Sequence, residues 1–159
     1  MPKQKMIDLL YELMKNSKRS DRELAKVVKV SQPTITRVRK NLEESGYVRE
    51  YTVMPDLEKL GFEIIAFNFL STDIGQEQAK EVHEWILKNQ KIFFSSSGQG
   101  LNEKTLLLVS IHKDFTDFST FTHEFRSFLG SKFPSMESFL VSLRTEVIKH
   151  FSFKNLERI

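Results

Sequence analysis

The sequence lacks cysteine altogether. Without cysteine, the chain cannot form disulfides, use a thiolate as a nucleophile or bind zinc through thiolates. No apolar run approaches the ~20 residues that a membrane-spanning helix needs. The N-terminal residues MPKQKMID reach an acidic residue before an apolar segment develops, so no signal peptide is expected. We therefore expect a cytoplasmic protein that does not enter a membrane.

Patterns typical of catalysis and metal binding are also missing. No Ser-His-Asp cluster, carboxylate pair or phosphate-binding glycine loop stands out. None of the four histidines is separated from another by three or four residues, the spacing that places two ligands on one helix face. We therefore expect no catalytic residue, metal ligand or cofactor. The histidines, for which we expect structural or surface roles, are His83, His112, His123 and His150.

The composition that remains is 40% hydrophobic and 28% charged, which fits an ordinary globular protein of one domain or two small ones. The net charge of +3 is unevenly distributed. Residues 15–40 contain nine Lys and Arg against two acidic residues. A basic N-terminal segment indicates a nucleic-acid-binding surface on one module. Charge alone does not distinguish this surface from a solvated helical face.

The first thirty residues predict two helices. Apolar residues at helical spacing indicate an amphipathic helix over residues 3–15. Ser20 stands three residues before Glu23, the reciprocal capping arrangement at a helix start. The second helix is therefore expected over residues 21–28.

A third helix should follow closely. Ser31 is a candidate cap, and Pro33 fits the first helical turn, where its missing N–H has no consequence. The helix is expected to end at Ser45, because Gly46 can adopt the left-handed conformation. Residues 47–54 are rich in aromatic and β-branched types and are predicted to form a strand.

The short connection between the second and third helices predicts a helix-turn-helix. Helices joined by residues 28–30 must cross steeply, and the small Ala25 permits their close approach. If the aliphatic residues of the third helix face inward, its polar residues face outward, and Arg, Gln and Thr are suited to base edges in the major groove. The expected DNA-facing residues are Gln32, Pro33, Thr34, Thr36, Arg37 and Lys40, with Arg39 beside them as a phosphate contact.

Lys29 occupies a position where many such turns have glycine, so a non-glycine residue is expected to need a positive φ angle. A three-helix interaction domain with a hydrated polar face is the alternative to a DNA-binding domain. Capping, turn spacing, outward residues and local charge together favour DNA binding.

The remaining residues predict a ferredoxin-like βαββαβ sandwich with both helices on one face of an antiparallel sheet. Gly98, Gln99 and Gly100 are expected to turn the chain after the second strand. The strands are predicted at residues 63–72, 91–97, 104–112 and 136–149, and the helices at 76–89 and 115–129.

Two of these strands are apolar on both sides, namely residues 64–69 and 106–109. A strand with one solvated face should alternate apolar and polar residues. The uncovered face of the sheet therefore needs a cover, and no further segment of the chain is left for it. The sequence predicts a homodimer in which two sheets pack face to face.

Three segments resemble the Lrp/AsnC family of transcription regulators: RELAKVVKVSQPTITRV at 22–38, NLEESGYVREYT at 41–52 and DLEKLG at 56–61. The resemblance implies an α+β fold with a winged helix-turn-helix domain at 1–54, a linker at 55–61 and a ferredoxin-like RAM domain at 62–159. It implies a sequence-specific, DNA-binding transcription regulator that forms homodimers, possible higher oligomers of dimers, and a palindromic site. It also carries DNA contact onto Ser31 through Lys40 and a backbone contact onto Arg49 in the wing.

The family's second domain commonly binds a small-molecule effector, often an amino acid, at a loop after its second strand. The matching residues are Gly98, Gln99 and Gly100, although the acidic residue that usually follows the first glycine is displaced. A flexible turn without a ligand is the alternative.

Two rival functions share the architecture. Siroheme decarboxylases resemble this family in both domains, and stand-alone family members bind ligands without DNA. The decarboxylases would need haem-facing His or Arg groups in the second domain. The basic third helix and the scattered histidines favour the regulator over both rivals.

Overall fold

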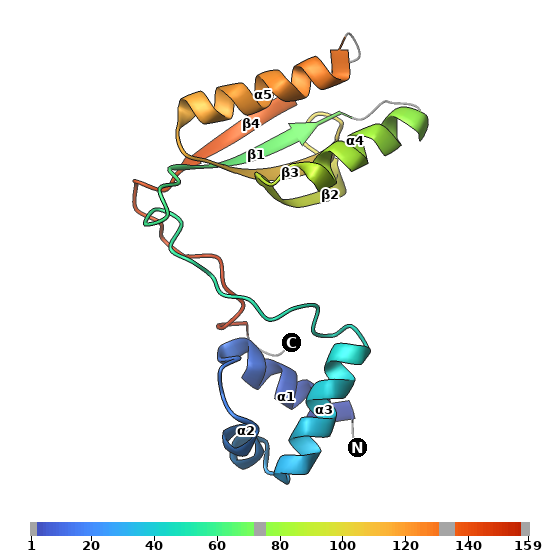
Figure 1. The fold of residues 1–159 in the computed structure, drawn as a ribbon, viewed down its shortest axis with the longest axis vertical. Helices are drawn as coiled ribbons and strands as arrows, with labels where there is room; N and C mark the ends of the chain where they lie inside the picture. The colour runs from blue at the N-terminus through green and yellow to red at the C-terminus, as the bar shows by residue number, and fades with distance from the viewer. Residues whose placement is uncertain (1–2, 72–75, 131–135, 157–159) are drawn as a thin grey trace. The chain divides into compact units, whose positions relative to one another are not determined.

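The structure, a computed structural model, describes residues 3–71, 76–130 and 136–156. The chain forms two compact units (Figure 1). The first contains the residues up to Met54 together with the C-terminal residues from Lys149, and the second runs from Pro55 to Ile148. None of the helices in the described ranges is long and apolar enough to cross a membrane.

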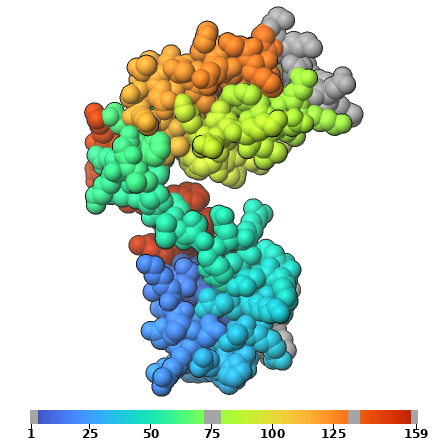
Figure 2. Space-filling view, viewed as in Figure 1, coloured from blue at the N-terminus to red at the C-terminus, as the bar shows by residue number. Residues whose placement is uncertain are grey.

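The first unit contains three helices: α1 (Lys3–Lys15), α2 (Asp21–Val28) and α3 (Gln32–Glu44). These bounds confirm the three predicted helices to within a residue or two. In space-filling view the helices form one continuous body, coloured blue to cyan (Figure 2). Their shared core consists of Leu9, Leu13, Leu24, Ala25, Val28, Ile35, Val38 and Leu42.

Local chemistry explains where α2 begins and ends. Ser20 and Glu23 form the predicted capping box, in which each side chain accepts a hydrogen bond from the other residue's backbone N–H. The Ser20 hydroxyl also donates to Glu23 Oε2 at 2.7 Å, and this bond, followed by the one from the Ser20 backbone N–H, lowers the pKa of Glu23. At the other end, Lys29 adopts the left-handed conformation with φ 57°, as its place in the turn predicted.

The predicted strand at 47–54 is wrong, because these residues form no strand. An extended segment becomes a strand only when another segment pairs with it. Within the described residues, all four strands belong to a single sheet in the second unit. β-propensity alone therefore could not produce a strand in the first unit.

The second unit has the predicted βαββαβ order and forms one antiparallel sheet, with strand order β2-β3-β1-β4. Helices α4 and α5 lie against this sheet (Figure 1). The elements are β1 (Ile64–Leu70), α4 (Gln76–Lys88), β2 (Ile92–Gly100), β3 (Lys104–His112), α5 (Phe115–Leu129) and β4 (Met136–Ser142).

Two strand lengths differ from the prediction. β4 ends at Ser142, which pairs with Ile64 at the start of β1, and the chain turns at residues 143–144. β2 continues to Gly100, which pairs with Lys104 of β3. The three residues that reverse the chain, all with positive φ, are Leu101, Asn102 and Glu103.

Both helices cover the same face of the sheet. The ring centroid of Trp85 in α4 lies 4.7 Å from that of Phe125 in α5. Below these rings, Leu70 and Leu108 extend the same buried cluster into the sheet. This arrangement confirms the expectation that one face carries both helices.

A chain of polar side chains is buried on this helix-covered face. Asn68 Nδ2 donates to Ser110 Oγ at 3.0 Å, and Ser110 Oγ lies 2.9 Å from His112 Nε2. Ser138 Oγ donates to Asn68 Oδ1 at 2.7 Å. His112 is fully buried, and burial lowers its pKa to about 4. The Asp117 carboxylate opposes this lowering, whereas the charge of Lys91 adds to it.

The opposite face, hereafter the open sheet face, carries an apolar row across all four strands. The strand registers align Phe94, Val109, Phe67 and Phe139 in adjacent positions. Phe94 and Phe139 expose 52% and 66% of their surface. The row therefore has an exposed phenylalanine on each edge strand, with the half-buried Phe67 and the buried Val109 between them.

Candidate nucleic-acid interface

Helix α3 separates apolar and polar residues onto opposite sides. Ile35, Val38 and Leu42 are buried in the core of the first unit. The exposed residues on the other side include five of the predicted DNA contacts. These are Gln32, Pro33, Thr36, Arg37 and Lys40.

Arg37 is the most available cation on this face. Among the described residues it forms no hydrogen bond or ion pair, and its side chain is exposed. Lys40 lies 3.6 Å from Glu44, and both side chains are largely exposed. Such an exposed pair contributes little stability, so Lys40 can exchange Glu44 for another anion at small cost.

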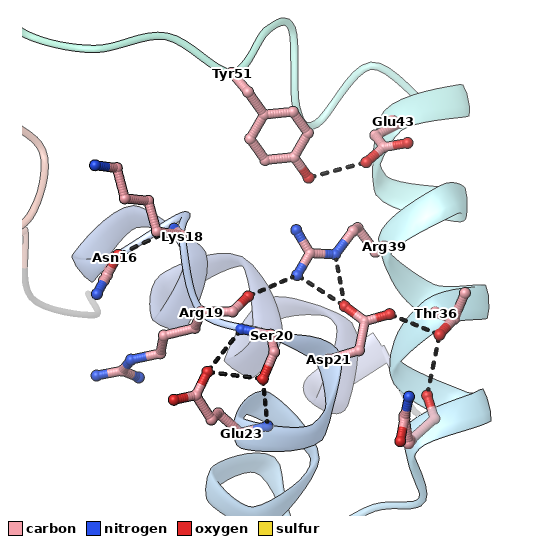
Figure 3. A network of polar contacts seen from close by, with 11 residues as sticks. Asn16, Lys18, Arg19, Ser20, Asp21, Glu23, Thr36, Arg39, Glu43 and Tyr51 are labelled. Atoms are coloured by element: carbon pink, nitrogen blue, oxygen red, sulfur yellow. Dashed lines mark hydrogen bonds and ion pairs between the residues drawn. The ribbon is translucent and has the colours of Figure 1, made fainter.

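Thr36 and Arg39 both donate hydrogen bonds to the carboxylate of Asp21 in α2 (Figure 3). Thr36 Oγ1 donates to Asp21 Oδ2 at 2.6 Å. Arg39 Nε donates to Asp21 Oδ1 at 3.0 Å. The sequence pattern does not reveal the role of Asp21, because residues 15 and 18 positions apart meet only once the two helices cross.

Ser31 and Thr34 lie at the start of α3 and contact each other. Ser31 occupies the N-cap position, as predicted, but its side chain makes no capping hydrogen bond. Its Oγ instead lies 2.8 Å from Thr34 Oγ1. The start of α3 is closed by the backbone, because Pro33 has no N–H and the N–H groups of Thr34 and Ile35 donate to the Ser31 carbonyl oxygen at 3.1 and 3.2 Å.

The segment after α3 packs against the helix through Tyr51. Its hydroxyl donates to Glu43 Oε1 at 2.9 Å, and Arg39 lies 6.0 Å from its ring centroid. Burial, followed by the bond to Glu43, raises the pKa of Tyr51. Arg49, the predicted backbone contact, lies in the same segment with an exposed side chain.

The predicted effector residues are not in a loop. Gly98, Gln99 and Gly100 lie at the end of edge strand β2, where all three are exposed. A Cβ added to Gly98 would meet no atom within 4 Å. No three His, Asp or Glu side chains in the described ranges are grouped to hold a metal ion.

Sequence comparison matches residues 4–49 to the winged helix-turn-helix DNA-binding family. The HTH-type transcriptional regulator LrpC of Bacillus subtilis is 36% identical over 58 residues, which are 36% of this chain and 40% of LrpC. The aligned part thus spans less than half of that relative. An uncharacterized HTH-type transcriptional regulator of Pyrococcus abyssi is 26% identical over 144 residues, 90% of this chain and 92% of that protein.

Solved structures share the fold across nearly the whole chain. The transcriptional regulator NMB0573 of Neisseria meningitidis, in complex with L-Met, gives a TM-score of 0.80 at 22% identity over 94% of each chain. AsnC of E. coli gives 0.76 at 14% identity over 95% of this chain and 98% of that one. The chain is thus similar in sequence to winged helix-turn-helix regulators over its N-terminal residues, and it has the fold of Lrp/AsnC-type regulators over nearly its whole length.

Proposed function

We propose that this protein is a sequence-specific DNA-binding transcription regulator. Arg37 carries most of the support, because it is exposed on the outer face of α3 and unpaired among the described residues. A free guanidinium can donate two hydrogen bonds to O6 and N7 of guanine. The regulators named among the sequence relatives support the same function and give no support for catalysis.

In the proposed complex, α3 lies in the major groove. Gln32 joins Arg37 in contacting base edges, since an amide can pair with adenine. Phosphate contacts and salt-sensitive affinity come from basic side chains, namely Lys40, Arg49 and the other exposed Lys and Arg side chains of residues 15–40. Such a protein works where the DNA is, so a cytoplasmic location accompanies the proposal.

The open sheet face supports a homodimer. Its aromatic row would pack against the same row of a second copy, which is the self-complementary contact that a two-fold axis requires. A dimer would present two α3 helices to a palindromic site. The half-site centres would then lie about 34 Å apart, or a multiple of that distance.

A small-molecule effector is a further part of the proposal. The related N. meningitidis structure is a complex with L-Met, which supports an amino acid as the class of ligand. In this chain the candidate contacts are Gly98, Gln99 and Gly100 at the end of β2. Backbone amides near glycines can approach a carboxylate closely.

Selection of bound duplexes from random DNA by the full chain tests the function. The expected result is a recurring motif made of two related half-sites with the spacing given above. Failure to retain any duplex in dilute buffer would contradict the proposal. A visible absorption spectrum of the protein mixed with a haem precursor provides a parallel check, because a decarboxylase-like site would shift the haem bands and a regulator would not.

A further inference from the structure

Asp21, the first residue of α2, lies at the centre of a polar network that joins α2 to α3 (Figure 3). Its Oδ2 accepts the bond from Thr36, and its Oδ1 accepts from Arg39 Nε and lies 2.8 Å from Arg39 Nη2. Thr36 and Arg39 are three positions apart and lie on neighbouring turns of α3. One carboxylate therefore holds two turns of the recognition helix.

Arg39 uses the rest of its guanidinium within the same unit. Nη2 also donates to the carbonyl oxygen of Arg19 at 3.3 Å. The guanidinium lies over the ring of Tyr51, within the range of a cation–π interaction. The side chain is only 21% exposed, and its charge is compensated by Asp21, which is 22% exposed. Arg39 is thus held as a structural cation, in contrast to Arg37.

We propose that Asp21 is a positioning residue for DNA discrimination, which fixes α3 against α2 and withholds Arg39 from the phosphates. The inference rests on the proposed DNA-binding function. A hydroxyl carries one proton, and that of Thr36 has two acceptors within α2 and α3: Asp21 Oδ2 at 2.6 Å and, at the longer distance of 3.3 Å, the Gln32 carbonyl oxygen. Thr36 can then offer a base its methyl group or its oxygen as an acceptor, but no hydrogen-bond donor. Discrimination through donated hydrogen bonds then depends mainly on Arg37 and Gln32.

Removal of the Asp21 charge has two consequences for DNA binding. A released Arg39 can pair with any phosphate, which raises the affinity for every duplex because phosphate contacts carry no sequence information. A less firmly oriented α3 loses the contacts to base edges that depend on geometry. The affinity for random DNA should rise while the preference for the specific site falls.

The test uses the full chain and its variants Asp21→Asn, Arg39→Met and the double variant. Affinity is measured at several salt concentrations for the selected site and for a random duplex of equal length. For D21N we expect higher affinity for random DNA and a lower ratio of specific to random binding. The slope of log affinity against log salt should steepen by about 0.9, the value for one added phosphate contact. The double variant should lack this steepening.

Glu44→Gln is the matched control. It removes a carboxylate from the same unit, and so changes the net charge as D21N does, but within the described part of the chain the Glu44 carboxylate pairs only with the exposed Lys40. The ratio of specific to random binding should stay at the wild-type value in E44Q. A fall equal to that of D21N would mean that net charge alone controls the ratio, and would overturn the proposal.

Arg39→Met tests whether Arg39 contacts the DNA, even if D21N does not fold. If Arg39 is withheld from DNA, R39M leaves the salt slope on random DNA unchanged. A slope shallower by about 0.9 would make Arg39 a direct phosphate contact and would overturn the positioning role. Failure of the wild-type chain to bind any duplex is a different outcome, since it would refute the proposed function itself.

Discussion

At the scale of single residues, Arg37 and Arg39 differ in environment although they are two positions apart. Arg37 is exposed and unpaired among the described residues, whereas Arg39 bonds to Asp21. Helical periodicity from the sequence was enough to place Arg37 outward. It could not identify Asp21 as the partner of Arg39, because that contact depends on the crossing of two helices. The assignment of Arg39 and Thr36 as DNA contacts remains a prediction. Their bonds to Asp21 argue against it, because these bonds occupy side-chain donors that would contact DNA.

Replacement of Arg37 by Ala should weaken binding to the preferred site by about 1–3 kcal/mol, the usual value of a bidentate contact to guanine. Affinity for random duplexes should change much less. Lys40→Ala is the control, since loss of a phosphate contact weakens all duplexes alike and lowers the salt slope by about 1. Titration of labelled duplexes measures both. Equal losses for R37A on both kinds of DNA would make Arg37 a phosphate contact.

His112 should make stability depend on pH. The pKa of His112 is about 4 in the folded chain, below its ordinary value. As the pH falls, the His112 imidazole therefore binds a proton at a higher pH in the unfolded chain than in the folded chain. The free energy of unfolding should therefore be at its full value above about pH 6.5 and should decrease by about 3 kcal/mol as the pH falls toward 4. Burial raises the pKa of Asp117, but the opposing effects, led by its bond to Lys91, outweigh burial and lower the pKa. Protonation of Asp117 therefore reduces the free energy of unfolding mainly below about pH 4.

Urea unfolding of the full chain at pH 7, 5.5 and 4.5 measures this dependence. His112→Gln cannot titrate and should show a flatter profile over the same range. The exposed His83 on α4 provides the control, because H83Q should leave the wild-type profile intact. If H112Q and wild type lose stability in parallel, burial of the histidine is not the cause.

At the scale of elements, the α2–α3 turn contains a residue in an unfavourable conformation. Lys29 has φ 57°, a region that glycine enters without a Cβ clash. Lys29→Gly should stabilise the first unit by about 1 kcal/mol relative to Lys29→Ala, which keeps the strain and also lacks the charge. Thermal unfolding of the two variants tests the difference. Equal midpoints would show that the turn is not strained at this residue.

The elements also show which structural features a sequence can specify. The bounds of α2 depend on residues next to it, Ser20 and Lys29, and the sequence predicted them correctly. The end of β4 at Ser142 lies opposite the start of β1, and this register between segments distant in the sequence was not predictable. The strand expected at 47–54 fails for the same reason, because propensity gives no information about a missing partner strand.

At the scale of the whole molecule, the open sheet face is the feature that a single copy leaves unexplained. Phe139 is exposed and aligned with Phe67 and Val109. Phe139→Asp should convert the proposed dimer to a monomer, since a buried charge at such an interface is costly. Sedimentation velocity measures the mass. Leu87→Asp, at a residue of α4 that is 86% exposed, is the control and should remain dimeric.

A monomeric wild-type chain, or a dimer that persists in F139D, would contradict the sheet-to-sheet contact. Dimerisation and DNA discrimination are linked in this account, because paired α3 helices must meet two half-sites together. F139D should consequently bind the full site no better than a single half-site.

Recognition of base pairs by the outer face of α3 is tested most directly by selection from random DNA with the wild-type chain and with Arg37→Ala. The wild-type chain should enrich duplexes with a guanine preference at two symmetry-related positions. The R37A chain should lose the preference at those two positions and keep the others. Enrichment of no sequence by the wild-type chain, or an identical motif from both proteins, would contradict the account.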